Sequence, residues 1–178
     1  MVLTPDRKAD VFTAISHRAR RQMLDLLAEA ERLKMAGALT GEQTALLNLP
    51  ALAAFWTSSL GQRIRAEEPF VQRELAFTAR FAPNELAAFS GQASDPSLGE
   101  EFVVVQGVAD LAVMRREEIW LVDFKTDRLS AEEALGRSKE YEPQLRLYAR
   151  ALSRIYRRPV TEAWFYFLGC GEAVQVEG

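Results

Sequence analysis

Residues 102–125 read FVVVQGVADLAVMRREEIWLVDFK, two apolar stretches joined by a charged connection at residues 115–118. This pattern predicts a β-hairpin centred on the middle of that connection, with a two- or four-residue turn. In that register Asp110 stands directly opposite Asp123. Opposed residues have Cβ atoms about 4.5–5.5 Å apart, so two carboxylates there destabilise the pair unless something neutralises them. A divalent cation would do so, and the hairpin is therefore a candidate metal site.

Alternation along the second strand places Lys125 on the same face as Asp110 and Asp123, and turns Phe124 toward the opposite layer. Two carboxylates that hold Mg²⁺ and a lysine that positions or deprotonates a water, or binds the anion under attack, are the parts of metal-assisted hydrolysis. The alternative is a surface hairpin with ordinary charges, because a one-residue slip of register removes the opposition. The apolar run at 119–122 favours the site, since unpaired charges at its end are costly.

The rest of the chain predicts helices before the hairpin and a mixture of elements after it. Helical signals are a long amphipathic stretch from Pro5 to Gly37, a short helix beginning at Thr40, and a third that opens at Pro50 and stops at Gly61. Period-two or buried runs predict strands at 71–81, 160–168 and 173–177, with a surface loop at 82–100. Two helices are expected within 130–158, broken near Glu142 because Pro143 follows it.

This order predicts the fold class α/β: a mixed β-sheet flanked by helices. We expect one domain over residues 1–178, in which residues 1–66 form a helical N-terminal part and residues 67–178 form the α/β core.

Composition limits the chemistry that the chain can perform. It has 178 residues, a net charge of -3, one cysteine (Cys170) and one histidine (His17). These counts exclude an internal disulfide, a cysteine-ligated cluster and a multi-histidine site, so a catalytic metal must rest on carboxylates, which favours Mg²⁺, Mn²⁺ or Ca²⁺ over zinc. No apolar run reaches the roughly 20 residues of a membrane helix and no signal peptide opens the sequence, so we expect a cytoplasmic protein with no membrane association.

Three motifs follow one another in the order of a known family: Gly107-Val108-Ala109-Asp110, Asp123-Phe124-Lys125-Thr126-Asp127-Arg128 and Tyr141-x-x-Gln144-x-x-x-Tyr148. With these motifs the chain resembles the C-terminal nuclease domain of AddA- and RecB-type helicase-nucleases, within the PD-(D/E)xK, restriction-endonuclease-like superfamily. Residues 37–40, 55–61 and 73–77 resemble the AddA branch in particular. The resemblance extends from about residue 30 to residue 168.

The resemblance implies a Mg²⁺-dependent deoxyribonuclease of exonuclease type, with Mn²⁺ or Ca²⁺ able to substitute in binding. It implies DNA as substrate, double-strand break repair and recombination as context, and, as partners, an attached or associated helicase motor and an AddB-type subunit. The sequence contains no G-x-x-x-x-G-K-[ST] motif, so this chain cannot drive unwinding by itself.

The resemblance also assigns roles to individual residues. Asp110, Asp123 and the backbone carbonyl of Phe124 are metal ligands, and Lys125 is the catalytic lysine. Further site residues are Glu74, on the preceding strand, and the helical pair Gln144 and Tyr148. The residues by themselves leave two alternatives open, because Glu74 fits a solvent-facing strand position and Tyr148 fits a core position.

The first helix departs from the family pattern G-T-x-x-H. Residues 12–17 lack the glycine and displace His17 by one position, which is about 100° around a helix. His17 is therefore either a metal ligand or a solvated histidine.

Two further alternatives concern binding and function. Arg146, Arg150 and Arg154 form a row at four-residue spacing that suits a phosphate backbone, a partner surface or simple solvation. The disturbed histidine motif and a sequence pI near 5.4 favour a rival function, a catalytically degenerate module of the same fold that binds DNA or a partner subunit.

Overall fold

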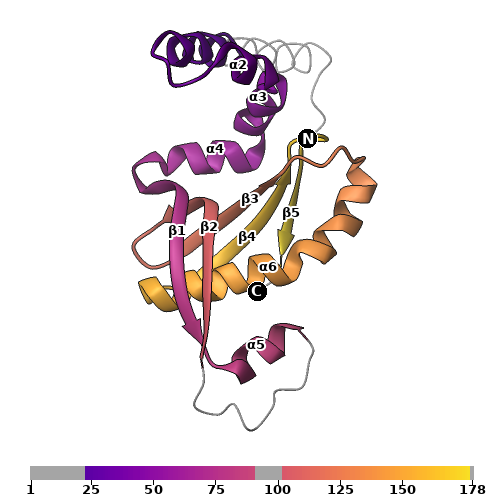
Figure 1. Cartoon of the computed structure of the whole chain (residues 1–178). Helices are drawn as coiled ribbons and strands as arrows, with labels where there is room; N and C mark the ends of the chain where they lie inside the picture. The colour runs from indigo at the N-terminus through magenta and orange to yellow at the C-terminus, as the bar shows by residue number, and fades with distance from the viewer. Residues whose placement is uncertain (1–22, 91–101, 177–178) are drawn as a thin grey trace, which may run out of the picture. The chain divides into compact units, whose positions relative to one another are not determined.

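The structure, a computed structural model, describes residues 23–90 and 102–176, and the chain divides after Arg63 into two compact units. The first unit is helical where it is described. Its elements are a helix over residues 23–35, α2 (Gly41–Leu46), α3 (Leu49–Thr57) and the first part of α4 (Ser59–Ala66). The second unit, residues 64–178, contains the sheet and every described residue of the predicted site (Figure 1).

Local signals decide where the short helices begin and end. The Thr40 hydroxyl accepts from the Gln43 N–H and the Gln43 side chain accepts from the Thr40 N–H, which confirms the predicted start of α2. The prediction of one helix from Pro50 to Gly61 is wrong, because α3 ends at Thr57. Gly61 lies inside α4, where a Cβ atom would be 2.1 Å from the Phe55 carbonyl oxygen, so it permits a close approach instead of ending a helix.

Five strands form a single mixed sheet, which confirms the predicted fold class. The strands lie in the order β1-β2-β3-β4-β5, with β3 and β4 parallel and all other neighbours antiparallel. Their bounds are β1 Val71–Phe81, β2 Val103–Met114, β3 Ile119–Lys125, β4 Val160–Phe167 and β5 Glu172–Val176. A short 3₁₀ helix, η1 (Glu68–Phe70), precedes β1.

The predicted loop at 82–100 is wrong for its first part, because α5 covers Pro83–Ser90. Pro83 occupies the first position of this helix, where a missing N–H costs nothing. The Glu85 carboxylate accepts from the Ala82 N–H at 2.9 Å and closes the helix start. Proline and asparagine thus served as helix-start residues here and not as loop residues. Residues 91–101 lie outside the described part of the chain.

The predicted break near Glu142 is also wrong, because α6 runs uninterrupted over Ala131–Tyr156 with Pro143 inside it. A proline within a helix removes one backbone hydrogen bond and tends to bend the helix. Figure 1 shows α6 bent along its length. Buried residues lie on both sides of Pro143, among them Ser138 and Leu145, so packing against the sheet holds the two halves in one helix.

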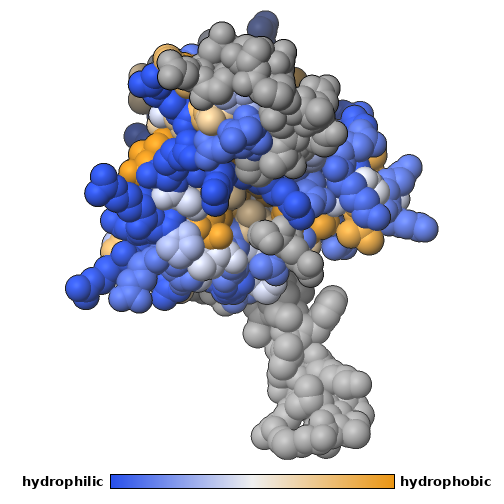
Figure 2. Space-filling model, turned by 90° about the horizontal axis from the view of Figure 1, so that it is seen from below, coloured by the Kyte–Doolittle hydropathy of each residue, from blue (hydrophilic) through white to orange (hydrophobic). Residues whose placement is uncertain are grey.

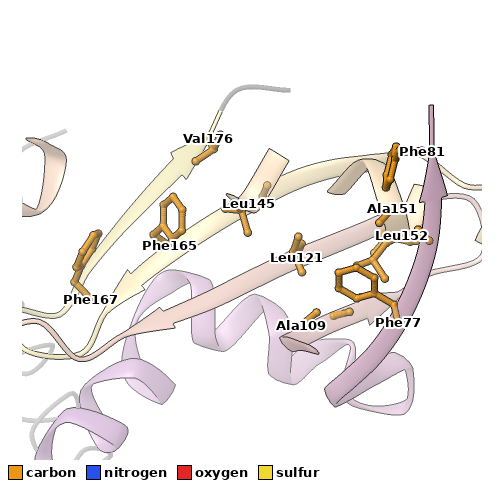
Figure 3. Packing of buried hydrophobic residues seen from close by; sticks show 14 of the residues in the cluster. Phe77, Phe81, Ala109, Leu121, Leu145, Ala151, Leu152, Phe165, Phe167 and Val176 are labelled. Atoms are coloured by element: carbon orange, nitrogen blue, oxygen red, sulfur yellow. The ribbon is translucent and has the colours of Figure 1, made fainter. Parts of the chain in front are cut away.

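The main core fills the space between α6 and one face of the sheet (Figure 3). Each strand contributes at least one buried side chain: Phe77, Ala79, Phe81, Ala109, Ala112, Ile119, Leu121, Ala163, Phe165, Phe167 and Val176. From α6, Leu145, Ala151 and Leu152 pack against them. This packing fixes α6 over the strands that carry the predicted site.

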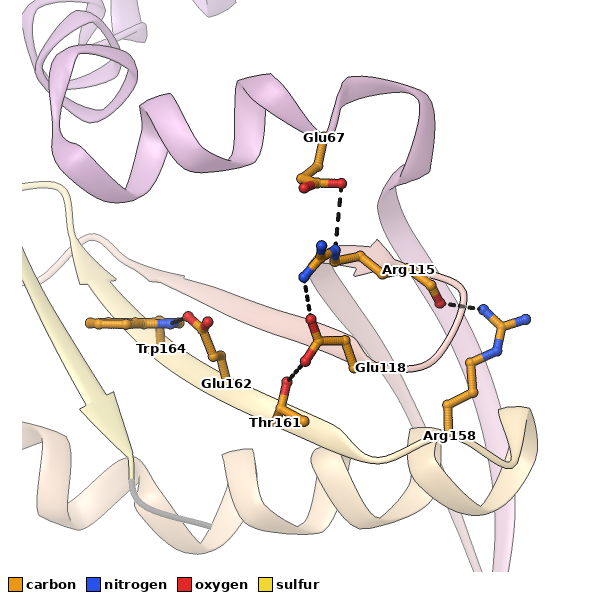
Figure 4. Close-up of polar contacts among 7 residues, drawn as sticks. All are labelled: Glu67, Arg115, Glu118, Arg158, Thr161, Glu162 and Trp164. Atoms are coloured by element: carbon orange, nitrogen blue, oxygen red, sulfur yellow. Dashed lines mark hydrogen bonds and ion pairs between the residues drawn. The ribbon is translucent and has the colours of Figure 1, made fainter.

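A polar network holds the β2–β3 connection (Figure 4). Glu118 accepts from Arg115 and, at 2.7 Å, from the Thr161 hydroxyl of β4. Arg158 donates to the Arg115 carbonyl at 2.7 Å, and Glu67 lies 3.6 Å from Arg115 Nε. Since these contacts pin the hairpin at its turn, they help to set the register at its other end.

Polar residues dominate the face of the molecule seen in Figure 2. Hydrophilic side chains cover most of its coloured surface, and hydrophobic residues form separate small groups among them. Neither described segment, 23–90 or 102–176, contains a helix long and apolar enough to cross a membrane.

Candidate active site

The hairpin register brings the two predicted carboxylate ligands together. β2 pairs with β3 through Leu111 and Val122, so the hairpin is centred on the middle of the 115–118 connection. One step further in the same register, Asp110 lies opposite Asp123. The Phe124 N–H donates to Asp110 Oδ2 at 2.8 Å. The Asp110 carboxylate thus reaches the backbone of β3 next to Asp123.

Asp123 is a buried carboxylate with an incompletely satisfied oxygen. It is 8% exposed, and Lys125 Nζ lies 2.8 Å from its Oδ2. Within residues 23–90 and 102–176, that oxygen finds no partner with the alignment of a hydrogen bond. Burial raises the pKa of Asp123, the ion pair with Lys125 opposes this, and the charge of Asp110 raises the pKa further.

The strand alternation around Lys125 agrees with the sequence pattern. The Phe124 ring contacts Tyr166 with centroids 6.3 Å apart. Lys125 Nζ instead lies 4.1 Å from the ring centroid of Tyr141, on α6, and 5.5 Å from that of Phe165. Asp123 and Lys125 therefore occupy the α6 side of the sheet, together with the main core.

Asp127 and Tyr141 complete the surroundings of Lys125, and sequence reasoning gave neither a role. The Tyr141 hydroxyl donates to Asp127 Oδ1 at 3.1 Å, and Arg137 Nε lies 3.8 Å from the same oxygen. Both residues stand inside quoted motifs, two positions after Lys125 and three before Gln144. Those positions were the available signal.

Glu74 lies in the same row of the sheet as the two aspartates. The β1–β2 register pairs Arg73 with Leu111 and Leu75 with Ala109, so Glu74 falls opposite Asp110. It is exposed, and its backbone is left-handed with φ 50°. A left-handed residue interrupts the regular alternation of a strand.

The opposite strand shows the same interruption. Ala109 and Ala112 both belong to the core on the α6 side although they are three positions apart. An odd step cannot stay on one face of a regular strand. The sheet is therefore kinked at the row formed by Glu74 and Asp110.

Gln144 and Tyr148 lie next to each other on α6. Gln144 Nε2 is 3.3 Å from the Tyr148 hydroxyl oxygen. The Tyr148 ring meets Phe77 edge to face, with centroids 4.9 Å apart, above Gly107. A Cβ atom at Gly107 would lie 2.7 Å from Phe77 Cζ and 2.9 Å from Tyr148 Cζ. The glycine of the first motif therefore makes room for the aromatic residue of the third.

The arginine row on α6 is partly neutralised. Arg146 Nη2 lies 2.6 Å from the Glu142 carboxylate. Arg154 donates to the Arg80 carbonyl and to Glu85 on α5. Arg154 thus has a structural role in holding α5 to α6.

The donor set fits a hard cation. Asp110, Asp123 and a backbone carbonyl at Phe124 offer oxygen ligands, and the incompletely satisfied oxygen of Asp123 is an acceptor that a cation would use. The described residues contain no group of three acidic, histidine or cysteine side chains able to hold a metal, and His17 lies outside them. Two carboxylates are enough for Mg²⁺, which commonly keeps several waters.

Comparison with known proteins agrees with this constellation. The family model described as the PD-(D/E)XK nuclease superfamily matches residues 5–177. The chain belongs to the PD-(D/E)XK nuclease superfamily. This membership confirms the resemblance predicted from the three motifs.

Relatives define the branch of the superfamily. The AddA polypeptide of the ATP-dependent helicase/nuclease of Carboxydothermus hydrogenoformans is 35% identical over 153 residues, which are 85% of this chain and 12% of that protein. The protein of the same name from Moorella thermoacetica is 35% identical over 133 residues, 75% of this chain and 9% of that protein. A third, from Bacillus cytotoxicus, is 30% identical over 97% of this chain and 14% of its own length.

These matches confirm an AddA-type PD-(D/E)XK nuclease domain. The chain spans only 9% to 14% of the length of these three relatives. The activities of the whole relatives are therefore not those of this chain by similarity alone.

Proposed function

We propose that this chain is a divalent-metal-dependent DNA nuclease that hydrolyses phosphodiester bonds as an exonuclease, with Mg²⁺ as its cofactor. We further propose that residues 1–178 act as one nuclease domain with a helicase motor and an AddB-type subunit, in the cytoplasm, during double-strand break repair. The superfamily and the names of the relatives support nuclease chemistry and a helicase context.

One observation carries the proposal: Asp110, Asp123 and Lys125 come together at the end of β3. Lys125 Nζ is 2.8 Å from Asp123 Oδ2, and the Asp110 carboxylate binds the N–H of the residue between them. Two carboxylates and an ammonium group this close, on a strand that is otherwise apolar, are costly for folding alone. A catalytic role accounts for that cost.

In this proposal Asp110 and Asp123 hold the cation, and the Phe124 carbonyl adds a third oxygen. A divalent cation bound there would polarise the scissile phosphate and lower the pKa of the attacking water. Lys125 orients that water or holds its proton. Gln144 and Tyr148 lie on the helix beside the site, and we assign them to the substrate strand, with Glu74 and His17 as supporting acidic and histidine positions.

Variants at Lys125 and Asp123 separate chemistry from metal binding. Lys125→Ala should abolish cleavage of a long end-labelled single-stranded DNA and retain Mn²⁺ binding measured by calorimetry. Asp123→Ala should lose both. Lys139→Ala changes an exposed lysine of α6 and is the matched control, for which both readouts should equal those of the wild type.

The same assay on circular single-stranded DNA tests the exonuclease type, because an exonuclease needs an end and should leave circles intact. Full activity of Lys125→Ala would disprove the mechanism.

One observation favours the rival, non-catalytic module. Asp110 is already engaged by a backbone N–H and Asp123 by Lys125, while the described residues supply no third acidic ligand. A wild-type protein that neither cleaves DNA nor binds Mn²⁺ would establish this second function.

A further inference from the structure

The ammonium group of Lys125 rests on an aromatic surface as well as beside a carboxylate. Its side chain is 15% exposed, and Nζ lies 4.1 Å from the Tyr141 centroid and 5.5 Å from the Phe165 centroid. A cation within about 6 Å of a ring centroid is attracted by the negative face of the ring, and more strongly where water is excluded. Lys125 thus has two kinds of partner, one anionic and one aromatic.

The nearer of the two rings is held in place by its hydroxyl group. Tyr141 donates to Asp127 Oδ1 at 3.1 Å, and the Arg137 guanidinium lies 5.2 Å from the same ring. Asp127 follows β3 directly, whereas Tyr141 belongs to α6. The hydrogen bond therefore ties the end of the catalytic strand to the helix.

The backbone beside Asp127 is closely packed against another segment. A Cβ atom at Gly169 would lie 2.5 Å from the Asp127 carbonyl oxygen, so glycine is needed for the chain after β4 to pass there. Asp127 is thus fixed from the backbone side, and it in turn fixes the hydroxyl of Tyr141.

We propose that Tyr141 is a positioning residue that holds the Lys125 ammonium beside Asp110 and Asp123, with Asp127 as its anchor. The importance of this hold for catalysis rests on the proposed function. A cation bound by Asp123 competes with Lys125 for the same carboxylate. The ring of Tyr141 takes no part in that competition, so it retains the ammonium at the site when the carboxylate turns to the metal.

Proton chemical shifts test the contact without any activity. The chain contains four lysines, so a sample labelled only at lysine gives few signals, and Lys125→Ala identifies the one of interest. Ring currents shift the Lys125 ε-methylene protons upfield of those of the exposed Lys34 and Lys139. Tyr141→Leu should remove most of this shift, and Tyr141→Phe, which keeps the ring, should retain it, both without and with Mg²⁺.

Kinetics test the consequence for the reaction. Tyr141→Leu should lower kcat roughly tenfold with KM for DNA unchanged, and Tyr141→Phe should restore most of the activity. Tyr156→Leu is the matched control, because Tyr156 also lies on α6 and packs against the same core but not on Lys125. Thermal unfolding of all three variants separates misfolding from mispositioning.

The outcomes are distinguishable. An unchanged Lys125 shift in folded Tyr141→Leu, or a kcat equal to that of Tyr156→Leu, overturns the role of Tyr141 and leaves the proposed function intact. A wild type that cleaves no DNA overturns the proposed function, while a shift that depends on the Tyr141 ring still supports the positioning contact.

Discussion

The missing side chain at Gly107 lets two aromatic rings meet over β2, and this gives a stability prediction at a single residue. Gly107→Ala places a methyl group within 3 Å of Phe77 and Tyr148, whose rings are packed against each other. Both rings must move, so the variant should lose about 1–3 kcal/mol of unfolding free energy, measured in urea.

Gly136→Ala is the control for this change. Gly136 lies inside α6 with open space around it, so alanine there should stabilise the protein by about 0.5–1 kcal/mol. A Gly107→Ala protein as stable as the wild type would show that the aromatic contact does not depend on the glycine.

The pairing of α5 with α6 is an element-scale contact that depends on pH. Hydrogen bonds from Arg154 and from the Ala82 N–H hold the pKa of Glu85 below its usual range. The folded-state pKa is the lower one, so the contribution to stability is complete above the unfolded-state pKa and is lost as the pH falls through the folded-state value.

A double-mutant cycle isolates this contribution. With Glu85→Gln, Arg154→Gln and the double variant, we expect a coupling of about 0.5 kcal/mol at neutral pH, because both side chains are partly solvated. The coupling should decline toward zero at acidic pH. A coupling of equal size at both pH values would mean that the Glu85 charge contributes nothing to it.

Most strands were predictable because their signals are local. β1 through β5 have period-two or continuous apolar runs, and the hairpin register follows from the symmetry of the two runs about residues 115–118. That register was sufficient to predict the neighbourhood of Asp110 and Asp123. The kink at Glu74 was not predictable, since nothing local distinguishes a glutamate with left-handed backbone.

The helices were harder to predict because packing over long sequence distances decides them. Pro143 is a break signal that the core contacts of α6 outweigh. A helix ending at residue 142 would have separated Tyr141 from Gln144. The contact between Tyr141 and Lys125 depends on where α6 lies on the sheet, and no sequence interval encodes that placement.

At the scale of the whole molecule, metal binding should appear as stability. A ligand that binds the folded state alone raises the free energy of unfolding by about 2.7 kcal/mol at one hundred times its Kd. Millimolar Mg²⁺ or Mn²⁺ should therefore raise the Tm of the wild type. Asp123→Asn should shrink this rise, while its metal-free form stays no less stable because a buried charge near Asp110 is gone.

Glu172→Gln is the control for that measurement. Glu172 is an exposed carboxylate of β5, and its loss should leave the full response to metal. An equal rise in Tm for wild type and Asp123→Asn would remove Asp123 from the metal site.

The left-handed backbone at Glu74 also affects how whole molecules meet. β1 is an eleven-residue strand at one end of the described sheet, and an exposed edge of that length is a template on which another chain can add a strand and begin to aggregate. Glu74 turns the backbone out of line and carries an exposed charge at that point. It divides the edge into two shorter segments, so it limits strand addition and favours a domain that stays dispersed at high concentration.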